Sequence, residues 1–472
     1  MKTHNPPFRE RHAPENCESQ GLRFGLIVGL TLAFVLLAFL LAMGQAPADE
    51  PPTIDAAGRA ATVDSLAILL ENCYVFPDRG KEMAKAIRQN LRKKEYDTLT
   101  DPGAFTETLT RDMRAITNDG HLWVAYSPEG SARIREAASD TADSARLAQE
   151  ELERARAGNF AFRNTEVLSG NVGYLKFNGF SGFAEATKTA EAAMGFLRNV
   201  DALIFDLREN TGGSPRMIQY LSSYLFDGEP RHLNSFYWRE DDTIVHTHTY
   251  PHIQGGKLAE IPVYILTSRQ TFSAAEEFTY NLKHMGRATI VGDTTGGGAH
   301  PVDRYAVTDD YVASISIGRA INPVTGTNWE GVGVIPHVAV PQEQALDAAR
   351  REAMRAIIAG GVDEDRERTL NWHIAGIDSE LDPFDLAADQ MEPYVGVYGP
   401  RTIAMEDGGL YYQRQDRPKY RMIPMATDMF RIPELEYFRL QFERDATGAV
   451  IAVVGLYVDG RSDRHQRGSA SP

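Results

Sequence analysis

Ser273 stands where a short apolar strand turns into a helix, in the stretch LTSRQTFSAAEEFTYNLKHMG at 266–286. A serine at the start of a helix is usually a capping residue. It can also act as a nucleophile, because the first turn of a helix carries a positive partial charge that favours negative charge on a nearby oxygen. The backbone N–H of Ala274 would lie beside it. The chemistry that this arrangement suggests is attack of a hydroxyl on a carbonyl group.

A glycine pair follows another short apolar strand, in the stretch DLRENTGGSPRM at 206–217. Gly212 and Gly213 can adopt backbone dihedrals that other residues avoid, and their N–H groups are free to face an anion. With the N–H of Ala274 they would form an oxyanion hole, in which each donor is worth roughly 10²–10³ in rate. This loop is what favours a nucleophile over a simple cap.

The hydroxyl of a serine nucleophile needs a neighbouring base, and the sequence offers two histidines. His121 follows an Asp-Gly turn and leads a strand in NDGHLWVAY, and His300 in TTGGGAHP is its competitor. Either can also be an ordinary turn histidine. A lysine base is excluded in this region, because Lys283 lies about 15 Å along the helix that Ser273 begins.

The base in turn needs a carboxylate that fixes its tautomer and its orientation. We expect Glu330 to have this role, because it precedes a glycine-flanked turn in NWEGVGVIPH. The alternative is an exposed glutamate at the entry of a strand.

Composition and motifs exclude several classes of partner. The chain has 49 basic and 65 acidic residues and a net charge of −16, which would repel nucleic acid. We expect no metal ion and no cofactor, because the sequence has no HExxH or CxxC pattern and no compact His/Asp cluster with ligand spacing.

The elements that must position these residues follow an α/β pattern. Short apolar runs at 171–177, 202–207 and 263–267 are typical of buried strands, and helical segments near 183–199 and 215–226 separate them. This alternation predicts a largely parallel sheet with right-handed crossovers. Functional groups gather at the carboxyl ends of such strands, where both loops described above lie.

The whole chain of 472 residues is long enough for two or three domains. We predict the following division: 1–23, a cytoplasmic basic segment; 24–44, a signal or transmembrane anchor; 45–57, a linker; 58–127, a helical domain; 128–164, a charged helical connector; 165–345, an α/β core; 346–390, a linker; and 391–466, a small antiparallel β domain.

Residues 24–44 contain no charged side chain. As a helix of about 1.5 Å per residue they would roughly span the ~30 Å hydrocarbon layer of a membrane. Basic residues precede the segment and acidic residues follow it, so the bulk of the chain should cross the membrane. The sequence leaves open whether the segment is a cleaved signal peptide or a retained anchor.

Four motifs, in this order, resemble the core of the C-terminal-processing (tail-specific) serine peptidases: GNVGYLKFNGF, ALIFDLRENTGGSP, TSRQTFSAAEEF and GDTTGGGAHP. The leader with YVFPD and TNDGHLWV is similar to the branch that contains the interphotoreceptor retinoid-binding protein and the tricorn protease core. The resemblance covers roughly residues 60–345.

This resemblance implies a crotonase-like (ClpP-like) α/β core between an N-terminal helical domain and a C-terminal β domain. It implies Ser273 as nucleophile, His121 and Glu330 as its partners, and an oxyanion hole from Ala274 and the Gly212–Gly213 loop. The chain departs from the family pattern in two places. His337 stands where an aspartate is usual, and the stretch 128–164 is too short for a PDZ domain.

We therefore predict a serine-type peptidase that hydrolyses peptide bonds through an acyl-enzyme, outside the cytoplasm and in the periplasm if the source is bacterial. Its substrate would be a peptide or an unfolded protein. Activity should fall at acidic pH with a midpoint near the ordinary histidine value of about 6.5. Two alternatives remain: a non-catalytic ligand-binding protein on the same fold, and a small-ester hydrolase. The sequence does not determine the oligomeric state or the role of the β domain.

Overall fold

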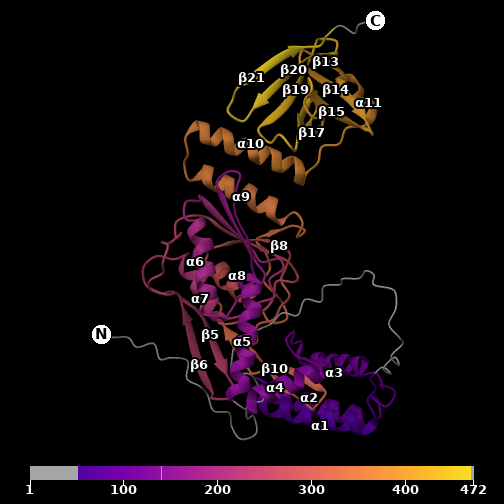
Figure 1. Cartoon of the computed structure of the whole chain (residues 1–472), viewed down its shortest axis with the longest axis vertical. Helices are drawn as coiled ribbons and strands as arrows, with labels where there is room; N and C mark the ends of the chain where they lie inside the picture. Colours follow the sequence, from indigo (N-terminus) through magenta and orange to yellow (C-terminus); the bar gives the residue numbers. More distant parts are fainter. Residues whose placement is uncertain (1–51, 140, 469–472) are drawn as a thin grey trace.

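The computed structural model describes residues 52–139 and 141–468, which form helical, mixed α/β and β parts in succession (Figure 1). The predicted segments 1–23 and 24–44 lie outside the described residues. Within the described ranges, no helix combines the length and the apolar character needed to cross a membrane. The division of the chain into domains stays a prediction.

Three helices open the described chain: α1 (Ala56–Cys73), α2 (Pro77–Arg92) and α3 (Pro102–Thr117). Aspartates cap the first and the third, because the side chains of Asp55 and Asp101 accept backbone N–H groups of the first turn. Asn118 ends α3 in the left-handed region with φ of 52°, so the chain reverses there. The loop that carries His121 therefore leaves this helix directly.

The strand after this loop ties the helical part to a small antiparallel sheet. The strands are β1 (Trp123–Tyr126), β10 (Tyr311–Ser316) and β9 (Val302–Ala306), in the spatial order β1-β10-β9. Two helices, α4 (Pro128–Ser139) and α5 (Thr141–Ala157), then lead to the central sheet through the short helix η1 (Asn159–Ala161).

The central sheet has six strands in the order β12-β8-β7-β4-β3-β2. They are β2 (Phe162–Leu168), β3 (Val172–Phe177), β4 (Ala202–Asp206), β7 (Val263–Thr267), β8 (Thr289–Gly292) and β12 (Val338–Ala339). All neighbours are parallel except the pair β2 and β3. The three strands predicted from apolar runs are β3, β4 and β7, so the mixed α/β class is confirmed.

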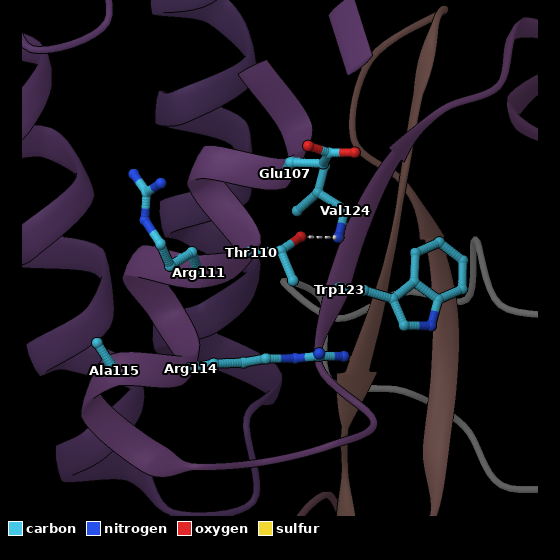
Figure 2. Close-up of a pocket in the computed structure, with 7 residues that line it drawn as sticks. All are labelled: Glu107, Thr110, Arg111, Arg114, Ala115, Trp123 and Val124. Carbon is cyan, nitrogen blue, oxygen red and sulfur yellow. Dashed lines mark hydrogen bonds between the residues drawn. The ribbon is translucent and has the colours of Figure 1, made fainter. Parts of the chain in front are cut away.

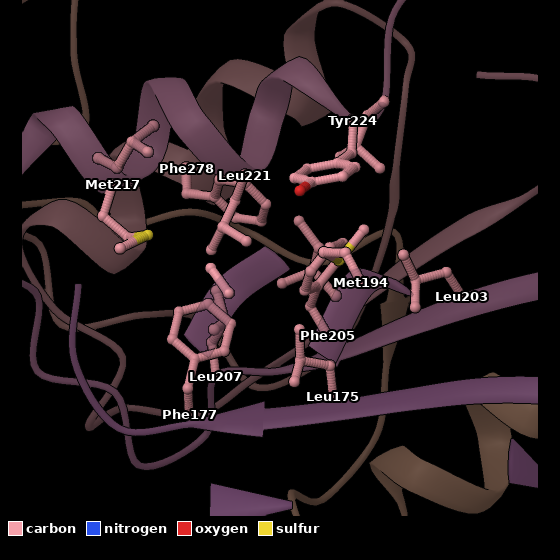
Figure 3. Packing of buried hydrophobic residues seen from close by; sticks show 14 of the residues in the cluster. Leu175, Phe177, Met194, Leu203, Phe205, Leu207, Met217, Leu221, Tyr224 and Phe278 are labelled. Atoms are coloured by element: carbon pink, nitrogen blue, oxygen red, sulfur yellow. The ribbon is translucent and has the colours of Figure 1, made fainter. Parts of the chain in front are cut away.

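Helices cover both faces of this sheet. On one face lie α6 (Ala186–Phe196), α7 (Pro215–Ser223) and α8 (Ala274–His284); on the other lie α9 (Ala345–Ala359) and α10 (Glu364–Leu381). The first layer is filled by large side chains such as Phe205, Leu221 and Phe278 (Figure 3). Ile204 and Leu266 point to the opposite layer, where small alanines let α9 approach. Burial on both faces explains why the strands read as continuous apolar runs.

A second antiparallel sheet, in the order β11-β5-β6, extends from the same core. Its strands are β5 (His232–Trp238), β6 (Thr243–His248) and β11 (Gly318–Ile321). In the described part of the chain β6 pairs only with β5, so it is the edge of this sheet.

The C-terminal part begins with the short helices α11 (Ala388–Met391) and η2 (Glu392–Tyr394). Nine strands follow: β13 (Gly396–Tyr398), β14 (Arg401–Glu406), β15 (Gly409–Arg414), β16 (Tyr420–Arg421), β17 (Ile423–Ala426), β18 (Met429–Arg431), β19 (Phe438–Arg444), β20 (Val450–Tyr457) and β21 (Ser462–Gln466). All pairings among them are antiparallel. The bridge between Tyr398 and Arg467 joins the first strand to the end of the last, and aromatic side chains fill the interior.

Candidate active site

Ser273 has a backbone conformation unlike that of the other helix starts. Its dihedrals are φ 56° and ψ −121°, whereas the capping residue Ser214 has the usual extended values of −91° and 131°. A positive φ is costly for a residue with a side chain, and such strain is commonly held at functional sites. The hydroxyl makes no side-chain hydrogen bond to cap α8. The geometry therefore differs from that of a simple cap.

The carboxylate of Glu276 holds this conformation in place. It is fully buried and accepts the N–H groups of Ser273 at 2.9 Å, Gly297 at 2.7 Å and Gly298 at 2.8 Å, as well as the hydroxyl of Thr295. Burial raises the pKa of Glu276 to about 7, while these donors favour the ionised form. One side chain thus links the start of α8 to the glycine loop at 296–298.

The predicted glycine loop at Gly212 and Gly213 lies directly against Ser273. The two glycines have φ of 110° and 139°, values that only glycine adopts readily. A Cβ at Gly212 would come within 2.8 Å of the Ser273 Cβ, and one at Gly213 would come within 2.1 Å of the Phe180 carbonyl oxygen. Both positions therefore require glycine, and the loop packs close to the serine.

The three predicted oxyanion donors differ in availability. The N–H of Gly212 donates to Asn210 Oδ1 at 2.9 Å. Among the described residues, the N–H groups of Gly213 and Ala274 donate no hydrogen bond. Gly212 therefore contributes the close approach of the loop, and the two free donors are on Gly213 and Ala274.

The ring of His121 packs on the residue that precedes Ser273. Its centroid lies 4.6 Å from that of Phe272, and its backbone N–H donates to Asp119 Oδ1 at 2.9 Å. The Nδ1 atom is buried, and in the described part of the chain it has no hydrogen-bond partner. Burial lowers the pKa of His121 to about 4, and Asp119 only partly offsets this effect. The imidazole is therefore neutral over the physiological range.

The second candidate, His300, lies between two buried carboxylates. Its Nδ1 is 3.3 Å from Asp119 Oδ2 and 3.5 Å from Glu330 Oε2. Burial alone would lower the pKa of His300, but the two carboxylates raise it. His300 in turn helps to lower the pKa of Asp119 to about 2, against the opposing effect of burial. His300 therefore fits a fixed cation better than a proton acceptor.

Glu330 is positioned differently from our expectation. Its carboxylate accepts the N–H groups of Gly120, Ala299 and His300 and approaches the ring of His300. No hydrogen bond between Glu330 and the ring of His121 is found in the described ranges. The predicted role of Glu330 as the carboxylate on the His121 ring needs correction, because Glu330 instead holds the backbone at Gly120, just before His121, and at Ala299 and His300.

Asp119, His300 and Glu330 also have the composition of a metal site. One ligand atom from each lies within 4.8 Å of the others, although the residues are far apart in sequence. The sequence showed no such cluster. Each carboxylate already accepts hydrogen bonds, including one to Asp119 from the hydroxyl of Tyr74. A proton on His300 would offset one of the two negative charges of this cluster.

Sequence reasoning missed three residues of this site: Asp119, Asn210 and Glu276. Glu276 had a signal, because a serine followed three residues later by glutamate is a capping-box pattern, but that pattern by itself predicts only the start of a helix. Asp119 and Asn210 each accept a backbone N–H two residues later, but their other partners come from distant segments: the ring of His300 for Asp119 and the Phe177 carbonyl group for Asn210.

A hollow of about 700 Å³ lies between α3 and β1, the two elements that the loop with His121 connects (Figure 2). Its lining residues are Glu107, Thr110, Arg111, Arg114, Ala115, Trp123 and Val124. Arg114 reaches from α3 and donates to the carbonyl groups of Leu122 at 2.8 Å and Gly120 at 2.7 Å. This side chain fixes the backbone on both sides of His121.

Comparison with known proteins gives two family matches. The model of "Peptidase family S41" matches residues 171–340, and that of the "N-terminal domain of Peptidase_S41 in eukaryotic IRBP" matches residues 57–163. The S41 match contains Ser273, the Gly212–Gly213 loop and Glu330, and the N-terminal match contains His121.

Curated relatives are similar over part of their length. A carboxyl-terminal-processing protease of Picosynechococcus is 25% identical over 179 residues, which cover 36% of this chain and 40% of the relative. The chloroplastic carboxyl-terminal-processing peptidase 2 of Arabidopsis thaliana is 27% identical over 188 residues, covering 38% and 34%. The chain thus spans less than half the length of these relatives.

Solved structures are similar at low identity. A putative peptidase of Parabacteroides merdae has 18% identity and a TM-score of 0.42, covering 60% of this chain and 90% of that one. The photosystem II D1 C-terminal processing protease has 15% identity and a TM-score of 0.39, covering 60% and 93%. The two family matches, which follow each other along the helical part and the central sheet, carry the conclusion. The chain belongs to peptidase family S41.

Proposed function

We propose that the chain is a serine-type peptidase that acts outside the cytoplasm, with Ser273 as its nucleophile. The observation that carries the proposal is the strained Ser273 backbone packed against a glycine loop, with the free N–H groups of Gly213 and Ala274 close by. Membership of a peptidase family supports it. A crotonase-like core is part of the same proposal.

The reaction would proceed through an acyl-enzyme. His121 takes the proton from the Ser273 hydroxyl as the oxygen attacks the peptide carbonyl carbon. The carbonyl oxygen becomes negative and accepts hydrogen bonds from Gly213 and Ala274. The C–N bond then breaks, and His121 returns the proton to the leaving amine. A water molecule, deprotonated by the same imidazole, releases the acyl group and regenerates the serine.

Electrostatics favour His121 over His300 as the base. A base must be neutral before the reaction, and the depressed pKa of His121 meets this condition, whereas the carboxylates around His300 favour its cation. Glu330 and Asp119 would hold the backbone at Gly120 and His121, and their carboxylates would stabilise the positive charge of His300. We therefore propose His121 as the base, and the variants His121→Ala and His300→Ala test it against His300.

The substrate proposed is a peptide or an unfolded protein, and no cofactor takes part. The matched relatives are named as processing proteases of carboxyl termini. The location outside the cytoplasm rests on the uncharged segment 24–44, as either a signal or an anchor.

The test is covalent labelling with a fluorophosphonate followed by peptide mass spectrometry. We expect the label on Ser273, and loss of both labelling and peptide hydrolysis in Ser273→Ala. Ser127→Ala is the matched control, because Ser127 likewise precedes a helix but is a simple cap, whose hydroxyl accepts the Gly130 N–H at 3.2 Å. His121→Ala should abolish hydrolysis, while His300→Ala should reduce it less.

Two outcomes would reject the proposal. Wild-type protein that hydrolyses short acyl esters but leaves a peptide library intact would be an ester hydrolase. Protein that binds an apolar ligand equally well with Ser273→Ala, and that no phosphonate labels, would be a binding protein on this fold.

A further inference from the structure

Three histidines lie together on the β5–β6 hairpin, outside the Ser273 site. They are His232 on β5 and His246 and His248 on β6. His232 is half-buried and the other two are exposed. Imidazole is a favoured ligand of zinc, copper and nickel ions, so a cluster of three on one surface suggests metal binding.

A β-bulge brings the three rings to one face. His232 pairs with His248, and Ser235 pairs with His246, with a register shift between His232 and Asn234. The shift places two residues of β5 opposite one of β6, and such bulges re-aim side chains. His246 and His248 share a face because they are two residues apart on one strand. The hairpin therefore presents a His-x-His pair with a third histidine directly across from it.

The spacing of the rings approaches that of a three-histidine site. In tetrahedral zinc sites the ligand nitrogens lie about 2.0–2.1 Å from the ion, so ring centroids lie about 3 Å from it and about 5 Å from each other. The centroids of His232 and His246 are 4.9 Å apart, and those of His232 and His248 are also 4.9 Å apart. The pair His246 and His248 is 6.5 Å apart. Among the described residues, the ligand nitrogens of these three rings do not all lie within 4.8 Å of one another, so binding of one ion by all three requires the exposed rings of His246 and His248 to rotate.

The hydrogen bonds around the rings leave suitable nitrogen atoms for an ion. His232 Nε2 is 3.0 Å from the Asn234 carbonyl oxygen and 2.9 Å from Ser235 Oγ, which leaves Nδ1 as its ligand atom. His246 Nδ1 is 2.8 Å from the same hydroxyl, which leaves Nε2. Metal-binding histidines commonly bond a carbonyl or a polar side chain through their second nitrogen in this way.

We propose that His232, His246 and His248 form a binding site for one divalent transition-metal ion of the zinc class. Ser235 is its outer hydrogen-bond partner. The fourth position of a tetrahedral ion would face solvent, since His246 and His248 are exposed. The ion would cross-link β5 to the edge strand β6 and so hold the edge of this sheet.

The test is calorimetric titration of Zn²⁺ into the full chain after removal of any affinity tag. We expect one saturable site per chain. His246→Ala and His248→Ala should each weaken binding at least tenfold, and Ser235→Ala should weaken it by about 10- to 100-fold, as for other outer-sphere partners. His252→Ala is the matched control, because it removes an exposed histidine four residues beyond His248 and should leave the affinity unchanged.

A second variant separates this site from the buried cluster near Ser273. His300→Gln should leave Zn²⁺ affinity unchanged, and Co²⁺ should give the visible absorption of a tetrahedral complex in wild type but not in His246→Ala. No saturable binding by wild type, or binding that survives the double replacement of His246 and His248, would overturn the proposal. So would binding that is lost only with His300→Gln.

Discussion

The free energy of unfolding of Glu277→Gln, relative to that of wild type, should increase as the pH rises from about 5 to 8. Glu277 lies in the first turn of α8 and is 4% exposed. Its polar neighbours are the side-chain amides of Asn234 on β5 and Asn281 one turn along the helix. Both amide nitrogens are buried without a hydrogen-bond partner in the part of the chain that the structure describes. The carboxylate is therefore poorly compensated.

The magnitude follows from its pKa. Burial raises the pKa of Glu277 from 4.5 to about 8, against the smaller opposing effect of the two amides. A group whose pKa is raised on folding stabilises the protein fully below its unfolded pKa and loses that contribution as the pH rises to the folded value. The loss amounts to about 1.4 kcal/mol per pH unit. Between pH 5 and 7 the wild type should thus lose about 3 kcal/mol relative to a variant that does not titrate.

The assay is urea unfolding of wild type and Glu277→Gln at several values of pH from 5 to 8. The difference in the free energy of unfolding between the two proteins includes a constant cost of about 1–3 kcal/mol if the new amide N–H₂ group lacks an acceptor. The readout is therefore the change of this difference with pH. Glu229→Gln is the matched control, because it makes the same replacement at an exposed glutamate. A difference between wild type and Glu277→Gln that does not change with pH would refute the reasoning, since it would mean that Glu277 is ionised in the folded protein throughout.

Three further predictions concern the site. The value of kcat/KM on an uncharged peptide should stay constant down to about pH 4, where His121 takes up its proton. A fall of kcat/KM with a midpoint near pH 6.5 would contradict the lowering of the His121 pKa by burial. His300→Leu should lower the free energy of unfolding at pH 7 by about 3 kcal/mol, because it leaves two buried carboxylates without their cation; a loss below about 1 kcal/mol in urea unfolding would argue against a charged His300. Gly213→Ala should reduce kcat about 10²-fold with the fold retained by circular dichroism, because its Cβ would clash with the carbonyl of Phe180 and move an oxyanion donor; unchanged kcat would exclude this loop from the reaction.

Much of the secondary structure could be predicted because it depends on local patterns. Apolar runs located β3, β4 and β7, and the proline at 215 after a serine marked the start of α7. The glycine pair at 212–213 predicted unusual dihedrals, and the positive φ values confirm them. These features need only the residue itself and its immediate neighbours in sequence.

The contacts within the candidate site could not be predicted in the same way. We placed Glu330 on the ring of His121, whereas it contacts His300 and the backbone of Gly120. We counted the Gly212 N–H as a free donor, whereas Asn210 accepts it. The expected midpoint of the loss of activity at acidic pH likewise moves from about pH 6.5 to about pH 4, because the imidazole of His121 is buried.

The sequence by itself determined the strand and helix order, the strained serine's place at a helix start, and the glycine loop, because periodicity and backbone preference act over a few residues. Only the tertiary structure decided which carboxylate balances which histidine and which N–H groups stay free. Charge pairing and desolvation depend on distance in space, and the residues at 119, 300 and 330 become neighbours only after the helical part docks against the sheet.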